Sequence, residues 1–198
     1  SLHDALPISV VADSVADHGN QGHGGWWYGY YDQQADRSGG DGSYQQGEFA
    51  QMTELKNSIW YVKQGKGGYW TQIQQTNMHP NGPVTGAGNM KETRHHVIRR
   101  WVSTVSGTLG IIGQLAKRGD AKGGDGVLGR IVVDGSQVYA QSVAGSDTTG
   151  YTIDTCVAVT KGSLLDLIVT PGAKAKATAD MDSTVFKVVL RASPTGCP

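Results

Sequence analysis

Aromatic side chains are the residues of this chain whose types and spacing most clearly suggest a binding chemistry. Residues 24–32 read GGWWYGYYD, and Trp60, Tyr61, Tyr69 and Trp70 follow. The faces of sugar rings stack on flat aromatic side chains, and Tyr and Trp add a polar group that can bond a hydroxyl. This block therefore predicts a carbohydrate-binding surface, with the alternative that its rings form a hydrophobic core.

Only one face of the aromatic block is predicted to contact a ligand. Successive side chains of a strand point to opposite faces, so Trp26, Tyr28 and Tyr30 share one of them. The sequence HPNGP at residues 79–83 cannot be the interior of a strand, and this loop would supply a hydrogen bond from a polar side chain. The predicted carbohydrate-binding residues are Trp26, Tyr28, Tyr30, Trp60, Trp70, His79 and Asn81.

Metal binding has weaker support in the sequence. Acidic loops offer oxygen ligands that suit a structural calcium, although solvated turn aspartates explain the same residues. No EF-hand spacing is present, and no histidine or cysteine spacing points to a transition metal. The candidate calcium ligands are Asp120, Asp125, Asp180 and Asp182. The sequence therefore names no certain cofactor and leaves a structural calcium open.

Catalytic motifs are scarce. The Gly-x-Ser-x-Gly motif of a nucleophilic serine is absent. Residues 61–63 and 69–72 faintly resemble the Y-F-K-x-G-x-Y-x-Q strand of jelly-roll alginate lyases, with an insertion between the two parts. A lyase-type acid, base and carboxylate neutraliser could come from His79, Arg94, His95 and Arg99. A jelly-roll polysaccharide lyase or glycosidase is thus one alternative function, and a protein without catalytic residues is favoured over it.

The charge and hydropathy of the chain exclude two classes of partner. Lys plus Arg and Asp plus Glu both number 17, so the chain has no net charge, whereas nucleic-acid binding needs a basic surface. No stretch of apolar residues is long enough to insert into a membrane. The two cysteines, Cys156 and Cys197, could form a disulfide, or Cys156 could simply be buried.

The second half of the chain reads as a series of short strands. Apolar residues alternate around Trp101, which we expect in the core. Asp134-Gly135 is the strongest hairpin signal, and we expect it between strands at residues 127–133 and 137–143. Short strands separated by turn residues, without long helical periodicity, predict an all-β, antiparallel jelly-roll β-sandwich.

The first half is less regular. We expect short strands at residues 59–62 and 68–73, and residues 48–55 could form a short helix. The aromatic block precedes the regular strands, and we expect it to lie away from them. The letters DALPIS near the start resemble a translated sequencing-library adapter. The expected organisation is an adapter-derived segment at residues 1–9, one β-sandwich domain at 10–192 and a tail at 193–198.

The order of strands and turns over residues 124–190 is familiar. A strand leads to an Asp-Gly hairpin and a return strand, followed by a V-x-V strand, a Gly turn, an L-x-L-x-V strand and an acidic loop. The residues that carry this pattern are Gly126, Val127, Ile131, Val133, Asp134, Gly135, Val138, Val157, Val159, Gly162, Leu165, Leu167, Val169 and Asp182. The pattern resembles the galactose-binding-like β-sandwiches, and among them the NPCBM family of carbohydrate-binding modules found on secreted bacterial glycosidases.

This resemblance implies a secreted, extracellular and non-catalytic carbohydrate-binding module. Its partner would be a polysaccharide or glycan, and it would belong to a larger secreted bacterial protein. A second interpretation is a structural or adhesive extracellular protein whose aromatic-rich first part mediates assembly. Such a protein would expose a large apolar patch or an unpaired edge strand.

Overall fold

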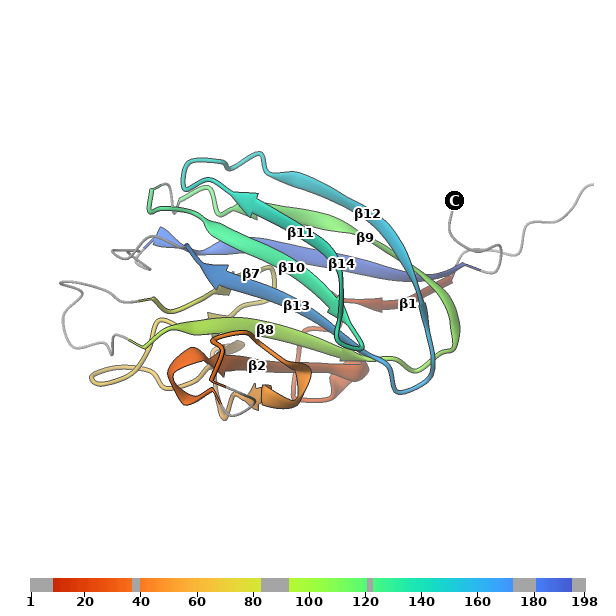
Figure 1. The fold of residues 1–198 in the computed structure, drawn as a ribbon, viewed down its shortest axis with the longest axis horizontal. Helices are drawn as coiled ribbons and strands as arrows, with labels where there is room; N and C mark the ends of the chain where they lie inside the picture. The colour runs from red at the N-terminus through yellow and green to blue at the C-terminus, as the bar shows by residue number, and fades with distance from the viewer. Residues whose placement is uncertain (1–8, 37–39, 83–92, 121–122, 173–180, 194–198) are drawn as a thin grey trace, which may run out of the picture.

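Two antiparallel sheets pack face to face and form the molecule (Figure 1). The computed structural model describes residues 9–36, 40–82, 93–120, 123–172 and 181–193. Apart from three short 3-10 turns, every regular element within these ranges is a strand. The predicted all-β, antiparallel sandwich is therefore confirmed. No helix in the described part of the chain is long and apolar enough to cross a membrane.

Sheet A has the strand order β12-β9-β14-β7-β6-β5-β4, and β1 pairs with β14 beside it. Its strands are β1 Ser9–Asp13, β4 Glu54–Lys56, β5 Ile59–Tyr61, β6 Gln72–Ile73, β7 Asn77–His79, β9 Gly107–Lys117, β12 Tyr151–Val159 and β14 Thr184–Ser193. Sheet B has the order β11-β10-β13-β8-β2-β3. Its strands are β2 Trp26–Asp32, β3 Ala50–Gln51, β8 His95–Val102, β10 Val127–Val133, β11 Ser136–Val143 and β13 Leu164–Pro171.

The core lies between the sheets because their strands alternate as the sequence indicates. In β8, Val97 and Trp101 point into the sandwich, whereas Arg100 lies on the outer face. Trp101 has no exposed surface, and its Nε1–H donates to the Gly24 carbonyl at 3.2 Å. The prediction that Trp101 is a core residue is confirmed.

The hairpin between β10 and β11 turns at Asp134 and Gly135, as expected. Their φ angles are 47° and 82°, so both residues adopt the left-handed conformation that a two-residue type I′ turn requires. The Asp134 carboxylate also accepts a hydrogen bond from the Leu164 backbone N–H at 2.8 Å. The turn is therefore tied to the start of β13 as well as closing its own hairpin.

The aromatic block does not lie away from the sandwich, and that expectation is wrong. Residues 26–32 form β2, which pairs along its whole length with β8 in sheet B. Trp26 lies opposite Trp101 in this register, and Asp32 lies opposite His95. The block alternates like any strand and covers a side of β8 that would otherwise be an open edge.

The possible helix at residues 48–55 is also wrong. A single 3-10 turn at Gln46–Glu48 is closed by a capping box, in which the Gln45 N–H donates to the Glu48 carboxylate at 2.9 Å. The chain then extends into β3 and β4, because the apolar residues of this stretch pack on the outer face of sheet B and in the core. The strands expected at 59–62 and 68–73 are present in shorter form as β5 and β6.

Some sequence predictions concern residues outside the described ranges. Residues 1–8 and 194–198 are among them, although Ser9 pairs with Ala192 at the start of β1. Cys197 and Asp180 also lie outside these ranges. The adapter-derived segment, the tail and the disulfide of Cys156 stay predictions.

Candidate functional site

Three of the aromatic residues predicted to bind a sugar belong to the hydrophobic core. Trp26 and Tyr28 have no exposed surface, and Trp60 is 6% exposed. Tyr28 stacks on Trp60 with ring centroids 5.7 Å apart, and the Trp60 Nε1–H donates to the Gly19 carbonyl at 2.9 Å. A ring without an exposed face cannot stack on a sugar, so the predicted ligand role of these three residues is corrected to a structural one. We call Trp26, Tyr28 and Trp60 the core aromatic group.

The alternation of β2 explains this correction. The face shared by Trp26, Tyr28 and Tyr30 points toward sheet A and packs into the core. Only Tyr30, near the end of the strand, lies at the margin of the core and is half-buried. The sequence grouped these residues on one face correctly but did not show that the face points inward.

The imidazole of His95 lies at the centre of a second aromatic group, at the start of β8. The ring centroids of Tyr30 and Tyr69 lie 4.7 Å and 4.4 Å from that of His95. The His95 Nδ1 is hydrogen-bonded to the Thr71 hydroxyl at 2.7 Å, and its Nε2 lies 3.8 Å from the Asp32 carboxylate. Burial lowers the pKa of His95 to about 4, although Asp32 acts in the opposite direction. The imidazole is therefore neutral at pH 7.

Asn81 fixes the backbone around this imidazole. Its backbone exchanges two hydrogen bonds with His95, at 3.2 Å and 2.9 Å. Its side-chain oxygen accepts a hydrogen bond from the backbone N–H of Trp70 at 2.9 Å, and its side-chain nitrogen donates to the Thr93 carbonyl. Asn81 has no exposed surface. Asn81 is therefore placed to position Trp70. The sequence predicted that it would bond a sugar, and that expectation is corrected.

His79 is also buried. Its Nδ1–H donates to the Pro80 carbonyl at 2.7 Å, and its ring lies 6.1 Å from that of Trp70. Burial lowers the pKa of His79 to about 4. The structure thus brings His79, Asn81, Tyr30 and Trp70 of the predicted set into one region, but places the first two beneath the aromatic rings.

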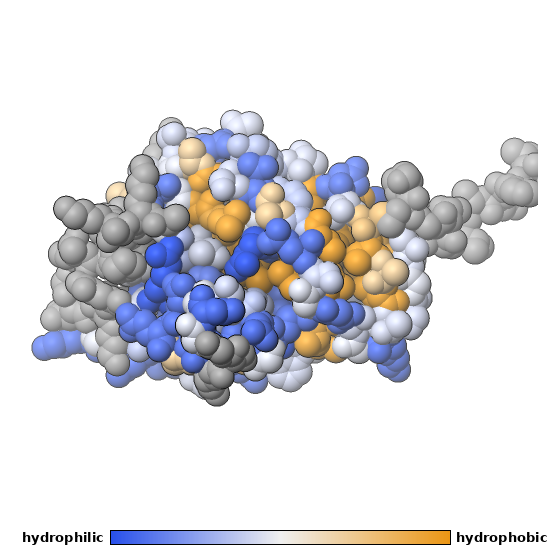
Figure 2. All heavy atoms as spheres, in the orientation of Figure 1, coloured by the Kyte–Doolittle hydropathy of each residue, from blue (hydrophilic) through white to orange (hydrophobic). Residues whose placement is uncertain are grey.

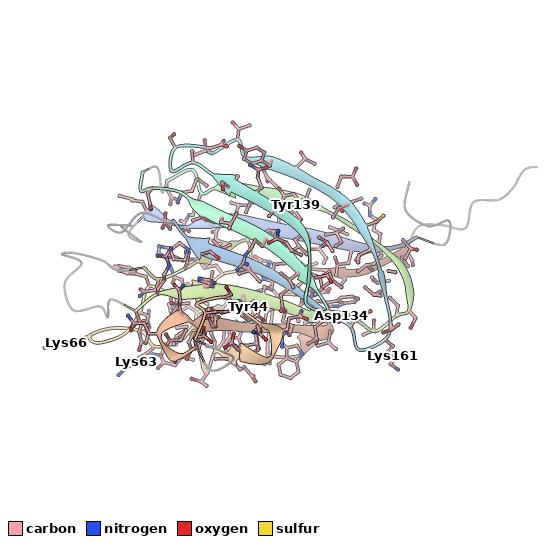
Figure 3. All side chains as sticks on the ribbon, in the orientation of Figure 1. Tyr44, Lys63, Lys66, Asp134, Tyr139 and Lys161 are labelled. Atoms are coloured by element: carbon pink, nitrogen blue, oxygen red, sulfur yellow. The ribbon has the colours of Figure 1, made fainter. Side chains whose placement is uncertain are left out.

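We call Tyr30, Tyr69, Trp70 and His95 the end cluster. The three aromatic residues are half-buried, in contrast to the core aromatic group. The loop that leads to Tyr69 projects at one end of the sandwich, where Lys63 and Lys66 are exposed (Figure 3). Within the described part of the chain, the buried indole Nε1–H of Trp70 has no hydrogen-bond partner. The end cluster therefore offers partly exposed rings around a neutral, fixed imidazole.

Sequence reasoning missed Tyr69 and His95 as members of this cluster. Tyr69 stood beside Trp70 in the sequence and could have been included with it. His95 was considered for metal binding and lyase chemistry only. Its position opposite Asp32 depends on the pairing of β2 with β8, which alternation within one strand cannot reveal.

A hydroxyl, an imidazole and a carboxylate stand in a row at Thr71, His95 and Asp32. This order is the one used to activate a nucleophilic hydroxyl. Thr71, however, has no exposed surface, and the His95 side chain is 1% exposed. A polymer could not reach the hydroxyl in this conformation, so the row orients the imidazole.

The four residues considered for lyase chemistry do not form a common site. The Arg99 guanidinium is fully buried and donates to the carbonyls of Ser14, Gln74 and Gln75 at 2.8, 2.7 and 3.1 Å. A guanidinium held in this way is not available to a substrate carboxylate. Arg94 donates to the carbonyls of Pro171 and Gly172.

The candidate calcium ligands are not gathered in the described part of the chain. Within it, no three His, Cys, Asp or Glu residues are placed to hold a metal ion. Asp120 is exposed and pairs with Arg118 at 2.6 Å, whereas Asp182 is buried and pairs with Lys117 at 3.2 Å. A structural calcium stays a prediction without a defined ligand set.

The outer face of sheet B carries a cavity of about 450 Å³. Arg100 forms a bidentate ion pair with Asp166, at 2.7 Å and 2.9 Å. The Tyr44 hydroxyl donates to Asp166 and accepts from Arg100, both at 2.8 Å, so the loop that carries Tyr44 is fixed across the sheet (Figure 3). The cavity is lined by Tyr44, Gln45, Gln46, Gly47, Arg130, Val132, Gly135 and Gln137.

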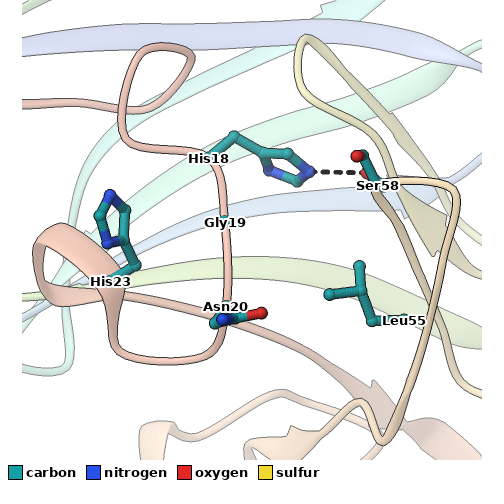
Figure 4. Close-up of a pocket in the computed structure, with 6 residues that line it drawn as sticks. All are labelled: His18, Gly19, Asn20, His23, Leu55 and Ser58. Atoms are coloured by element: carbon teal, nitrogen blue, oxygen red, sulfur yellow. Dashed lines mark hydrogen bonds between the residues drawn. The ribbon is translucent and has the colours of Figure 1, made fainter.

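Another cavity, of about 330 Å³, lies between the segment at residues 18–23 and the β4–β5 hairpin (Figure 4). The His18 Nε2–H donates to the Ser58 carbonyl at 2.9 Å, and the His18 ring packs edge-on against Tyr28 at 4.9 Å. Burial lowers the pKa of His18. The cavity is lined by His18, Gly19, Asn20, His23, Leu55 and Ser58.

No protein-family profile and no curated protein sequence matches this chain. Among solved structures, a family 35 carbohydrate-binding module from Clostridium thermocellum is similar in fold. The two chains are 14% identical, the match covers 65% of this chain and 84% of that chain, and the TM-score is 0.32. The sandwich architecture described here rests on the pairing of the strands themselves, and the resemblance to the NPCBM family stays a prediction.

Proposed function

We propose that this protein is a non-catalytic carbohydrate-binding module that holds a polysaccharide on the end cluster. The observation that carries the proposal is the packing of Tyr30 and Tyr69 against His95, with Trp70 beside them, at one end of the sandwich. Partly exposed aromatic rings offer the flat apolar surface on which a sugar stacks.

The rings of the end cluster are supported from beneath by a fixed group without a charge. His95 is buried, neutral at pH 7 and held by Thr71, so it fixes the positions of Tyr30 and Tyr69. Asn81 fixes the backbone of Trp70 from below. A pre-formed site of this kind loses little conformational freedom when a ligand binds.

The binding expected from such a site is weak. Each stacked ring contributes about 0.5–1.5 kcal/mol beyond its buried area, so a site with three rings should bind in the micromolar to millimolar range. Weak binding suits a module that keeps a larger secreted protein close to a polymer, and we propose this extracellular context for the chain.

Assembly into a structural surface would need a different feature. A continuous exposed apolar patch is the usual sign of self-association. In the described ranges, the exposed large apolar residues are Val10, Leu55, Ile112, Tyr151 and Met181. The end cluster gathers several partly exposed aromatic rings in one place, and for this reason we favour binding to a glycan over assembly.

Affinity electrophoresis and pull-down against a panel of polysaccharides would test the proposal. We expect Tyr69→Ala and Trp70→Ala each to weaken binding about 2- to 12-fold. Tyr151→Ala is the matched control, because Tyr151 is an exposed tyrosine on β12 of sheet A, outside the end cluster.

The control must keep wild-type binding, and all variants must retain a cooperative thermal transition. If the wild-type protein binds no polysaccharide, the proposal fails. It also fails if Tyr151→Ala weakens binding as much as the two end-cluster variants do.

A further inference from the structure

The cavity on the outer face of sheet B contains a guanidinium without a carboxylate partner. Arg130 lies on β10 and points away from the core, since its neighbour Ile131 points into it. Its cross-strand neighbours are Ala140 on β11 and Ile168 on β13. Neither side chain can pair with a charge, and no carboxylate in the described ranges lies within ion-pair distance of Arg130.

Arg100 on the same face shows what a structural arginine looks like in this protein. Its guanidinium is bidentate with Asp166 and also donates to the Tyr44 hydroxyl and the Gln46 carbonyl. Arg130, by contrast, has a buried Nε–H that finds no hydrogen-bond partner among the residues that the structure describes. A half-buried, charged donor group that the fold does not satisfy is suited to a ligand.

The carboxylates of the neighbouring segments are already engaged. Asp166 is held by Arg100, the Asp134 carboxylate accepts from the Leu164 N–H, and the Glu48 carboxylate accepts from the Gln45 N–H. None of them is placed to neutralise Arg130.

A second guanidinium, that of Arg94, acts together with Arg130 on His96. Burial, together with the charges of Arg130 and Arg94, lowers the pKa of His96 to about 3. His96 is therefore neutral at pH 7, and within the described ranges Arg94 donates to the carbonyls of Pro171 and Gly172. Two guanidinium charges thus act on His96, and the ion pairs among the described residues include neither Arg94 nor Arg130.

The shape of the cavity suits a sugar unit. The loop containing Tyr44 forms one wall and the β10–β11 hairpin, with Gly135 and Gln137, forms the other. Figure 2 shows hydrophilic surface on the face that sheet B presents, between two hydrophobic areas. A volume of about 450 Å³ falls within the usual range of a small-molecule site.

We propose that this cavity is a second subsite, which binds an anionic sugar unit of a polysaccharide through the guanidinium of Arg130. The anionic group is a carboxylate or a sulfate ester, because both present oxygens that match the paired N–H donors of a guanidinium. The subsite is separate from the end cluster and does not depend on it.

Isothermal titration of the full chain with two anionic probes and one neutral probe tests this inference. The probes are oligogalacturonate, a sulfated galactan oligosaccharide, and a neutral galactan oligosaccharide of the same length. We expect Arg130→Gln to weaken binding of at least one anionic probe by about tenfold or more, since a hydrogen-bonded charge is lost. Loss of one probe only identifies the anionic group.

Two controls separate this subsite from general charge effects and from the end cluster. Arg118→Gln removes the same charge from a residue whose side chain is 39% exposed, and this variant should bind both anionic probes like the wild type. Tyr69→Ala reports on the end cluster and should keep the dependence on Arg130. The inference is overturned if the wild-type protein binds neither anionic probe, or if Arg130→Gln binds both as well as the wild type does.

Discussion

The core aromatic group and the end cluster contain the same kinds of residue in different surroundings. Trp26, Tyr28 and Trp60 lie between the sheets with almost no exposed surface, whereas Tyr69 and Trp70 lie at one end and are half-buried. The core rings are covered from both sides by strands. The end rings are covered from below by a neutral histidine and an asparagine. The position along the sandwich, not the residue type, thus separates a structural aromatic residue from a candidate ligand-binding one.

The largest difference between the two groups should appear in stability. Trp26→Ala removes a fully buried indole that lies opposite Trp101, and should lower the free energy of unfolding by about 3–5 kcal/mol. Trp70→Ala removes a half-buried ring and should cost much less. Urea unfolding of both variants measures this difference. Equal losses of stability would show that Trp70 is as structural as Trp26.

The pH dependence of stability should reflect the buried histidines, among them His95 of the end cluster and His79 beside it. The pKa values of His79 and His95 are lowered to about 4 from an ordinary 6.5, so the unfolded state binds more protons between these values. The stabilisation linked to these neutral histidines is therefore fully present above about pH 6.5. The free energy of unfolding falls as the pH is lowered toward 4, by on the order of 2–3 kcal/mol for His79.

Denaturant titrations at several pH values would measure this effect. His79→Gln should flatten the profile between pH 4 and 6.5, because the variant lacks one titrating group. A profile identical to that of the wild type would mean that His79 is not buried in its neutral form.

Asn81 should link the stability of the end cluster to its binding. Asn81→Ala leaves the part-buried backbone N–H of Trp70 and the part-buried carbonyl of Thr93 without their partner, and should lower the free energy of unfolding by about 1–3 kcal/mol. Polysaccharide binding should weaken together with stability, because Trp70 loses its support. Thermal unfolding and affinity electrophoresis on one preparation test this, and a destabilised variant with unchanged affinity would separate Asn81 from the site.

The smallest effect is expected at the turn of the β10–β11 hairpin. Gly135 adopts a φ of 82°, where an alanine costs about 1–2 kcal/mol. Gly135→Ala should therefore lower stability slightly and leave binding at the end cluster unchanged. A large loss of binding in this variant would mean that the two regions are coupled.

Much of the fold could be predicted from the sequence, and the particular elements show why. Alternation around Trp101 and the Asp134-Gly135 pair report local geometry, so the strands of the second half and the hairpin were predicted correctly. The pairing of β2 with β8 is a contact between distant segments and leaves no local signal. The aromatic block was therefore expected outside the sandwich, although it forms one of its strands.

The candidate site could be predicted only in part, for the same reason. Alternation placed Trp26, Tyr28 and Tyr30 on one face but could not say which side of the sheet that face would take. Tyr69 and His95 come together through the contacts among β2, β8 and the loop before β6. Arg130 carries no motif at all, and its lack of a partner is visible only when its cross-strand neighbours are known.

The most direct test follows the five tryptophan indole N–H signals by NMR during a titration. The added ligand is an oligosaccharide fragment of a polysaccharide that the protein binds. We expect the signal of Trp70 to shift until the site is saturated, whereas the signals of Trp26, Trp60 and Trp101 stay in place. Signals would be assigned by single tryptophan-to-phenylalanine substitutions. A fragment that binds but leaves Trp70 unchanged would contradict the claim that the end cluster is the binding site.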